Sequence, residues 1–261
     1  MAPSGARARF QANLDALRTL RQLQHQDRAA TSAERATLAR WGSWGAAGVA
    51  EVFDEQRAEF AADRDALRGL LSEAEYDAAS RTTLNAHYTD PALASEIWQT
   101  LETLGFEGGQ ALEPGPGSGT FIGLAPEGTR MTGIELDPGT ADISQALYPE
   151  ATIRAESFAD SGFGGAKFDA AVGNVPFSNR SLQDRTHDRG RYSMHNHVII
   201  KSLALARPSK KITPNVRTTP NADIRRGAQP PQHLLGPTLE SGAVVLTSAL
   251  VDQPESSGRI M

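Results

Sequence analysis

A glycine-rich segment that follows a short apolar run is the part of this chain best suited to hold a small ligand. Residues 111–119 read Ala-Leu-Glu-Pro-Gly-Pro-Gly-Ser-Gly. Glycine adopts turn conformations closed to residues with a Cβ, and it lets a ligand approach the main chain. Between a strand and a helix, such a loop directs backbone N–H groups and the positive end of a helix dipole at the ligand. The predicted ligand contacts are Glu113, Gly115, Gly117 and Gly119, and close approach of a ligand is our explanation for the three glycines.

The spacing of the glycines distinguishes between two nucleotide cofactors. The pattern is Gly-x-Gly-x-Gly, and Thr120 stands where the Gly-x-Gly-x-x-Gly pattern of dinucleotide sites wants Gly or Ala. This spacing disfavours NAD and favours S-adenosylmethionine.

Strands and helices alternate from residue 110 to 173 at the spacing of βαβ units. The expected strands are 111–112, 131–136, 152–155 and 168–172, and the expected helices between them are 119–124 and 138–147. Short apolar strands without clean alternation indicate an α/β fold with a parallel sheet buried on both faces. Ligands of such sheets bind at the carboxyl ends of the strands.

Polar residues follow each of these strands. Glu135 lies 22 residues after Glu113, so its carboxylate is placed to accept both ribose hydroxyls of an adenosyl group, with Leu136 beside it. After the third strand, Glu156 and Ser157 could hydrogen-bond the adenine edge and Phe158 could stack on its ring. An ordinary turn explains these three residues equally well.

A turn after the fourth strand carries the sharpest chemical prediction. The side-chain carbonyl of Asn174 and the backbone carbonyl of Val175 can converge on one amino group and turn its lone pair toward an electrophile. Pro176 would fix the backbone, and Phe177 would offer a face on which a flipped base stacks. The alternative is an Asn-x-Pro turn that only ends the strand.

In these residues the chain resembles the DNA adenine-N6 methyltransferases that carry an Asn-Pro-Pro-Tyr/Phe signature. More narrowly, it is similar to the methylase portion of large bacterial methylase–helicase proteins of plasmids and phages. The resemblance covers most of residues 8–208, and its most specific parts are the glycine loop and residues 174–177. It departs from the signature at Val175, where Pro is usual, although that position is expected to act through its carbonyl.

The resemblance implies a Rossmann-like, S-adenosylmethionine-dependent methyltransferase sheet with Tyr88 and Thr89 against the cofactor. It also implies direct methyl transfer to a flipped adenine of DNA, in a restriction–modification or helicase-associated setting. Two other functions stay open: methylation of a protein glutamine at N5, which uses the same kind of turn, and a non-catalytic remnant that binds the cofactor.

The rest of the chain suggests four parts. Residues 1–80 are expected to form a helical extension, whose Trp41 and Trp44 pack it on its neighbour. Residues 81–208 hold the methyltransferase core, residues 209–240 read as an irregular insert, and residues 241–261 contain a possible fifth strand. The early end suggests a truncated member that lacks a recognition region or helicase.

Composition limits the remaining possibilities. The 261 residues carry a net charge of −5 and no cysteine, which fits a cytoplasmic protein without disulfides. No apolar run approaches the roughly 20 residues of a membrane span. No acidic partner is well placed in the sequence for His187, His195 and His197, so we expect a capping or core role and no metal. DNA contact would fall to the arginine-rich loop 178–194, for which a solvated loop is an equal alternative.

Overall fold

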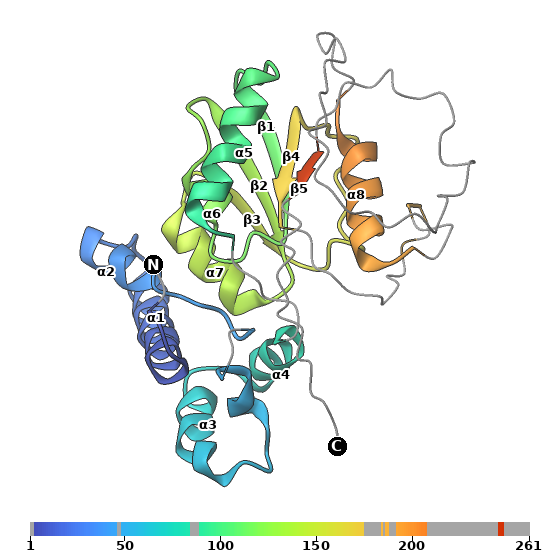
Figure 1. The fold of residues 1–261 in the computed structure, drawn as a ribbon. Coiled ribbons are helices and arrows are strands. Elements are labelled where there is room, and N and C mark those ends of the chain that lie inside the picture. The colour runs from blue at the N-terminus through green and yellow to red at the C-terminus, as the bar shows by residue number, and fades with distance from the viewer. Residues whose placement is uncertain are drawn as a thin grey trace, which may run out of the picture.

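The computed structural model describes residues 3–45, 48–83, 89–174, 184, 186–187, 192–207 and 245–247. Within these residues, a five-stranded parallel sheet with the order β3-β2-β1-β4-β5 forms the centre of the fold (Figure 1). The strands are β1 Gly109–Pro114, β2 Thr129–Glu135, β3 Thr152–Ala155, β4 Ala170–Gly173 and β5 Val245–Thr247. This is a Rossmann-like α/β sheet, and the predicted fifth strand is confirmed. The strand order reverses between β1 and β4, where such sheets bind ligands beyond the strand ends.

Helices cover both faces of the sheet (Figure 1). They are α5 Pro91–Thr103, α6 Thr120–Gly123, α7 Pro138–Leu147 and α8 Met194–Leu205. Successive side chains of a strand point to opposite faces. Ala111 accordingly packs with α5 and α6, whereas Leu112 packs with Val198 of α8. The sheet is therefore buried on both faces, as its apolar strands predict.

Local capping determines where several helices begin. Thr31 and Ser72 each form a complete capping box at the start of α2 Ser32–Leu38 and α4 Glu73–Thr82. Asp90 caps α5 by accepting the N–H of Ala92, and Pro91 follows it at the first helical position.

The N-terminal helices form a layer outside α7. The layer consists of α1 Ala6–Gln26, α2, α3 Ala61–Arg68 and α4, and it shares an apolar cluster with Ile143 and Leu147 of α7. Trp41 and Trp44 are each 1% exposed in that cluster, which confirms their predicted packing role.

One part of this layer is not a continuous helix. Residues 50–68 form two 3-10 turns, Ala50–Phe53 and Ala58–Phe60, followed by α3. Buried Arg64 donates to the carbonyls of Val52, Asp54 and Arg57. The guanidinium thus satisfies backbone acceptors that a continuous helix would have satisfied internally.

No helix among the described residues is both long and apolar enough to span a bilayer. Several predictions concern positions outside the described residues: those for Tyr88, for Val175, Pro176 and Phe177, for the arginines of loop 178–194, and for the insert 209–240.

Candidate functional site

The carboxyl edge of the sheet gathers the predicted polar residues from four strands. Glu113 is the next-to-last residue of β1, Glu135 is the last residue of β2, and Glu156 directly follows β3. Asn174 directly follows β4, which pairs with β1. The parallel registers thus place Glu113 and Asn174 on either side of the point where the strand order reverses, as predicted. Thr89, just ahead of α5, is buried.

The glycine loop has a backbone that requires glycine. The φ angles of Gly115, Gly117 and Gly119 are +75°, +56° and +83°. Other residues pay a steric penalty in this left-handed region. Two internal hydrogen bonds shape the loop, from the Gly115 N–H to the carbonyl of Ile134 at 2.8 Å and from the Gly119 N–H to that of Pro116 at 2.9 Å.

Close approach of a ligand is not the only reason for these glycines, and the prediction needs correction at one of them. A Cβ on Gly119 would lie 2.5 Å from the ring of Tyr148, which follows α7, so the protein's own packing already excludes a side chain there. A Cβ on Gly115 would meet nothing within 4 Å. At Gly115, unlike Gly119, the space next to the backbone is open, so a ligand could approach the main chain there.

Glu113 is buried without full hydrogen bonding. The residue is 2% exposed, and its Oε2 atom has no partner among the described residues. Burial raises the pKa of the Glu113 carboxyl well above its usual value, and the nearby Glu135 raises it further. A buried polar atom left unpaired is costly and rare in proteins. The oxygen is therefore placed to receive a donor from a ligand.

Glu135 connects the glycine loop to the start of α7. Its Oε2 accepts the Gly117 N–H at 3.0 Å, and its Oε1 accepts the Asp137 N–H at 3.0 Å. Burial raises the pKa of Glu135 to about 7 despite these two hydrogen bonds. Each carboxylate oxygen can accept a further hydrogen bond. The adjacent Leu136 is 58% exposed, so its apolar side chain is accessible at this edge of the sheet.

The turn after β3 has a structural role of its own. Glu156 pairs with Arg154, and Ser157 Oγ accepts the N–H of Ala159. Phe158 is 9% exposed and packs edge-on against Phe163 in the core. The ring therefore packs in the core, which corrects the prediction that it stacks on adenine. Contact of Glu156 and Ser157 with a cofactor stays a prediction.

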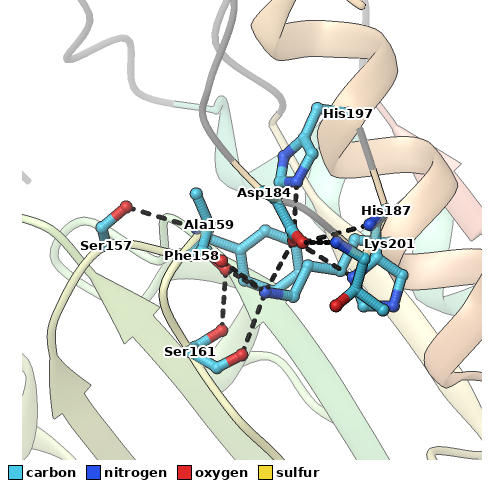
Figure 2. A network of polar contacts seen from close by, with 9 residues as sticks. Ser157, Phe158, Ala159, Ser161, Asp184, His187, His197 and Lys201 are labelled. Carbon is cyan, nitrogen blue, oxygen red and sulfur yellow. Dashed lines mark hydrogen bonds and ion pairs between the residues drawn. The ribbon is translucent and has the colours of Figure 1, made fainter. Parts of the chain in front are cut away.

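The histidines have an acidic partner that the sequence does not reveal. The carboxylate of Asp184 contacts Nδ1 of His187 at 3.1 Å and Nε2 of His197 at 3.0 Å (Figure 2). This corrects the expectation that no acidic residue lies near them. Lys201, the only Lys, Arg, Asp or Glu in α8, joins the same group. The isolated lysine in an apolar helix is visible in the sequence and could have indicated a buried charge. The sequence does not show that Asp184 reaches His197 and Lys201 of α8. No group of three or more metal-ligating side chains was found among the described residues.

Comparison with known proteins identifies partial relatives. No protein-family model matches the chain. It is 33% identical over 100 residues to "Defense against restriction protein B" of Escherichia phage P1, a match that covers 38% of this chain and 4% of that protein.

Solved structures with a related arrangement include two methyltransferases. One is a type I restriction-modification system methyltransferase subunit from Streptococcus thermophilus, with 13% identity, a TM-score of 0.40, and coverage of 75% of this chain and 53% of that one. The other is a SAM-bound amino pentose methyltransferase from Micromonospora echinaspora, with 18% identity, a TM-score of 0.34, and coverage of 51% and 52%. This chain therefore spans about half of each structure, and its function has to be inferred from its own residues.

Proposed function

We propose that this chain binds S-adenosylmethionine at the carboxyl edge of its sheet and transfers the methyl group to the N6 amino group of adenine in DNA. The observation that carries the proposal is the buried Glu113 carboxylate, with Oε2 unpaired, beside a glycine loop and one strand away from Asn174. S-adenosylmethionine carries an ammonium and a sulfonium group, so a buried carboxyl with an unpaired oxygen complements its charge once it ionises.

The remaining residues of the edge fit the other parts of this cofactor. Glu135 keeps acceptor capacity for ribose hydroxyls after its two backbone hydrogen bonds. Exposed Leu136 offers an apolar contact for the adenine ring. Glu156 and Ser157 follow at the next strand end, where the polar edge of the base would lie, and Tyr88 and Thr89 complete our predicted cofactor contacts.

The bound cofactor would supply an electrophilic methyl group, so catalysis by the chain consists mainly of orientation. The Asn174 side chain and the Val175 carbonyl would accept the two hydrogens of the substrate amino group, and the nitrogen lone pair would then face the methyl group. Pro176 would hold the turn in shape, while Phe177 would stack on the base. The amino nitrogen would form its new bond to the methyl carbon as the bond between that carbon and sulfur breaks, S-adenosylhomocysteine would leave, and the methylated nitrogen would release one proton to solvent.

DNA is the substrate that the available observations favour. The partial relative in phage P1 is a defence-against-restriction protein, a setting in which the modified polymer is DNA. The predicted arginine-rich loop 178–194 directly follows the catalytic turn and would meet phosphates. A protein glutamine side chain is the second candidate, because its amide NH₂ can be held by the same pair of carbonyls.

Calorimetric titration with S-adenosylmethionine tests the first half of the proposal. Glu113→Gln removes the charge without changing the size of the side chain, and it should weaken binding by at least about tenfold, since a charged hydrogen bond contributes about 1.5–3 kcal/mol. Glu127→Gln, on an exposed residue just before β2 at the opposite edge, is the matched control and should bind as the wild type does. Unchanged affinity in Glu113→Gln, or no binding by the wild type, would refute the cofactor site.

Transfer of a labelled methyl group tests the second half. The wild-type chain is incubated with unmethylated genomic DNA or with a mixture of proteins, and incorporated label is counted in each. We expect label in DNA and its loss in Asn174→Ala with unchanged cofactor affinity. Label in protein alone would favour the glutamine alternative, and activity that survives Asn174→Ala would exclude the proposed turn.

A further inference from the structure

Lys201 of α8 carries a buried positive charge that backbone carbonyls surround. The residue is 2% exposed. Its Nζ atom donates to the carbonyls of Phe158 at 2.6 Å, Ala159 at 3.0 Å and Ser161 at 3.0 Å (Figure 2). An ammonium has three protons to donate, so these three carbonyls match its capacity. The turn that follows β3 is thus folded around the ammonium of a helix on the sheet face.

Asp184 meets the same ammonium from another part of the chain. Its Oδ2 atom lies 3.3 Å from Lys201 Nζ and also contacts His187 and His197. Its Oδ1 atom accepts the backbone N–H groups of Thr186 and His187. Burial would raise the pKa of Asp184, but the hydrogen bonds from His197, His187 and Thr186 outweigh burial and lower it. Asp184 is therefore an ionised carboxylate that connects Thr186 and His187 to α8.

His197 of α8 is a second buried side chain in this group. The residue is fully buried, its Nε2 faces Asp184 Oδ2, and its Nδ1 has no partner among the described residues. The Asp184 carboxylate and the Lys201 ammonium lie side by side in this group, and such pairing is the condition for burying opposite charges at moderate cost.

The two segments joined by Lys201 belong to opposite sides of the proposed reaction. The turn at 158–161 continues from Glu156 and Ser157, which are predicted to meet the adenine of the cofactor. Asp184 comes ten residues after Asn174 and lies in the segment predicted to contact DNA. Lys201 contacts both (Figure 2). It is the side chain through which the position of one segment can fix the position of the other.

We propose that Lys201 and Asp184 are positioning residues of the methyl-transfer site, in which Lys201 shapes the cofactor-side turn and Asp184 locks the acceptor-side segment to it. This inference rests on the proposed function. It assigns different effects to the two residues: Lys201 acts on both sides of the reaction, and Asp184 acts on the acceptor side alone.

The different effects lead to a test with two variants and two measurements. Lys201→Met keeps the length of the side chain but removes the charge and all donors, so affinity for S-adenosylmethionine should fall about tenfold together with turnover. In Asp184→Asn, Lys201 still holds the turn at 158–161, so affinity for S-adenosylmethionine should stay within about twofold of the wild type. Its kcat/KM for unmethylated genomic DNA should fall about tenfold, because the acceptor is misplaced.

A merely structural role would produce a different result. Loss of folded protein would lower cofactor affinity and DNA methylation in the same proportion in both variants, and this outcome would overturn the inference. So would wild-type kcat/KM in Asp184→Asn. Arg207→Met is the matched control, since it removes the exposed ion pair with Asp169 near the opposite edge of the sheet and should change neither quantity.

Two further measurements keep the inference separate from folding and from the proposed function. If Lys201→Met does not fold, Lys201→Arg replaces it, because arginine keeps the charge near Asp184. Its planar guanidinium cannot meet three carbonyls at one point. The free energy of binding S-adenosylmethionine should therefore be reduced more than the free energy of unfolding. Amide hydrogen exchange in the wild type and Asp184→Asn needs no ligand. Faster exchange at 186–187 with unchanged exchange at 115–119 is expected, and equal exchange at 186–187 would overturn the lock even if the chain is not a methyltransferase.

Discussion

Burial of the Glu113 carboxyl with one unpaired oxygen makes the folded protein sensitive to pH. The folded-state pKa of Glu113 lies above its ordinary value of 4.5, and that of Glu135 is raised to about 7. A folded chain therefore retains protons that the unfolded chain releases. By linkage, the stability that these protons contribute is fully present below pH 4.5 and is lost as the pH rises through the folded-state values.

Glu113→Gln should change this dependence. We expect the Tm of the ligand-free wild type to fall between pH 5 and pH 8, and the Tm of Glu113→Gln to fall less because the amide cannot ionise. The difference should vanish near pH 4, where both carboxyl groups hold their protons. Differential scanning calorimetry across this range measures the effect, with Glu127→Gln expected to follow the wild type. Parallel curves for Glu113→Gln and the wild type would show that this carboxyl does not titrate between these pH values.

The same residue should give cofactor binding the opposite pH dependence. A cationic ligand needs the ionised carboxylate, so affinity for S-adenosylmethionine should rise with pH while stability falls. Binding should therefore release protons in the pH range where the folded Glu113 carboxyl is still protonated, and titrations in buffers of different ionisation enthalpy can count them. Glu113 would thus lower the stability of the free protein and provide a charged contact to the ligand, a combination that is typical of binding sites.

At the scale of elements, the parts of the fold that follow from the sequence are those with local causes. The starts of α2, α4 and α5 depend on hydrogen bonds within three residues of Thr31, Ser72 and Asp90, so they can be predicted from neighbours alone. The two 3-10 turns near Val52 depend on the side chain of Arg64, which follows them in the chain. The backbone carbonyls that accept hydrogen bonds from Arg64 can be assigned only once the tertiary structure is known.

The glycine loop allows backbone strain to be separated from packing. Gly115 and Gly119 have almost the same φ, but an added Cβ has open space at Gly115 and would meet the Tyr148 ring at Gly119. Gly115→Ala should destabilise the fold by about 1–2 kcal/mol from the left-handed conformation alone. Gly119→Ala should add a further roughly 1–3 kcal/mol from overpacking. Urea denaturation of the two variants measures this difference, and equal losses would indicate that the Tyr148 ring moves aside freely.

At the scale of the whole molecule, the N-terminal layer reaches the proposed cofactor site through a chain of hydrogen bonds. Trp41 Nε1 donates to Thr140 Oγ1 at 3.2 Å, and this hydroxyl donates to Asp137 Oδ2 at 2.6 Å. The Asp137 N–H in turn donates to Glu135, which also accepts the N–H of Gly117. The helices, in which the sequence shows no chemistry, thus support the carboxylate predicted to hold the ribose.

Such a contact could not have been read from the sequence. Trp41 and Thr140 are 99 residues apart in the sequence, and the packing of the N-terminal layer on α7 brings them together. Asp184 and Lys201 likewise meet only because α8 packs on the sheet beside the turn after β3. The sequence predicts which strand ends carry polar residues, because the parallel topology brings those ends to one edge. It does not predict the buried groups that hold them in place, since those groups come from helices whose packing partners are not encoded locally.

Two tryptophans permit a controlled test of the N-terminal contribution. Trp41 is 1% exposed and Trp98 is 2% exposed, and each donates one indole hydrogen bond: Trp41 to Thr140, and Trp98 to the carbonyl of Phe121. Replacement of either residue by Phe keeps an aromatic ring in the core and removes the donor, so both variants should lose a similar stability of about 1–3 kcal/mol.

Affinity for the cofactor should nevertheless separate the two variants. Only Trp41 is connected to Asp137 and Glu135, so Trp41→Phe should weaken binding of S-adenosylmethionine about threefold to tenfold, which corresponds to about 0.7–1.4 kcal/mol. Trp98→Phe should bind as the wild type does once corrected for the folded fraction. Calorimetric titration together with urea denaturation of the same samples measures both quantities. Equal affinities in the two variants would mean that the N-terminal layer supports the fold of the sheet but not the geometry of its ligand site.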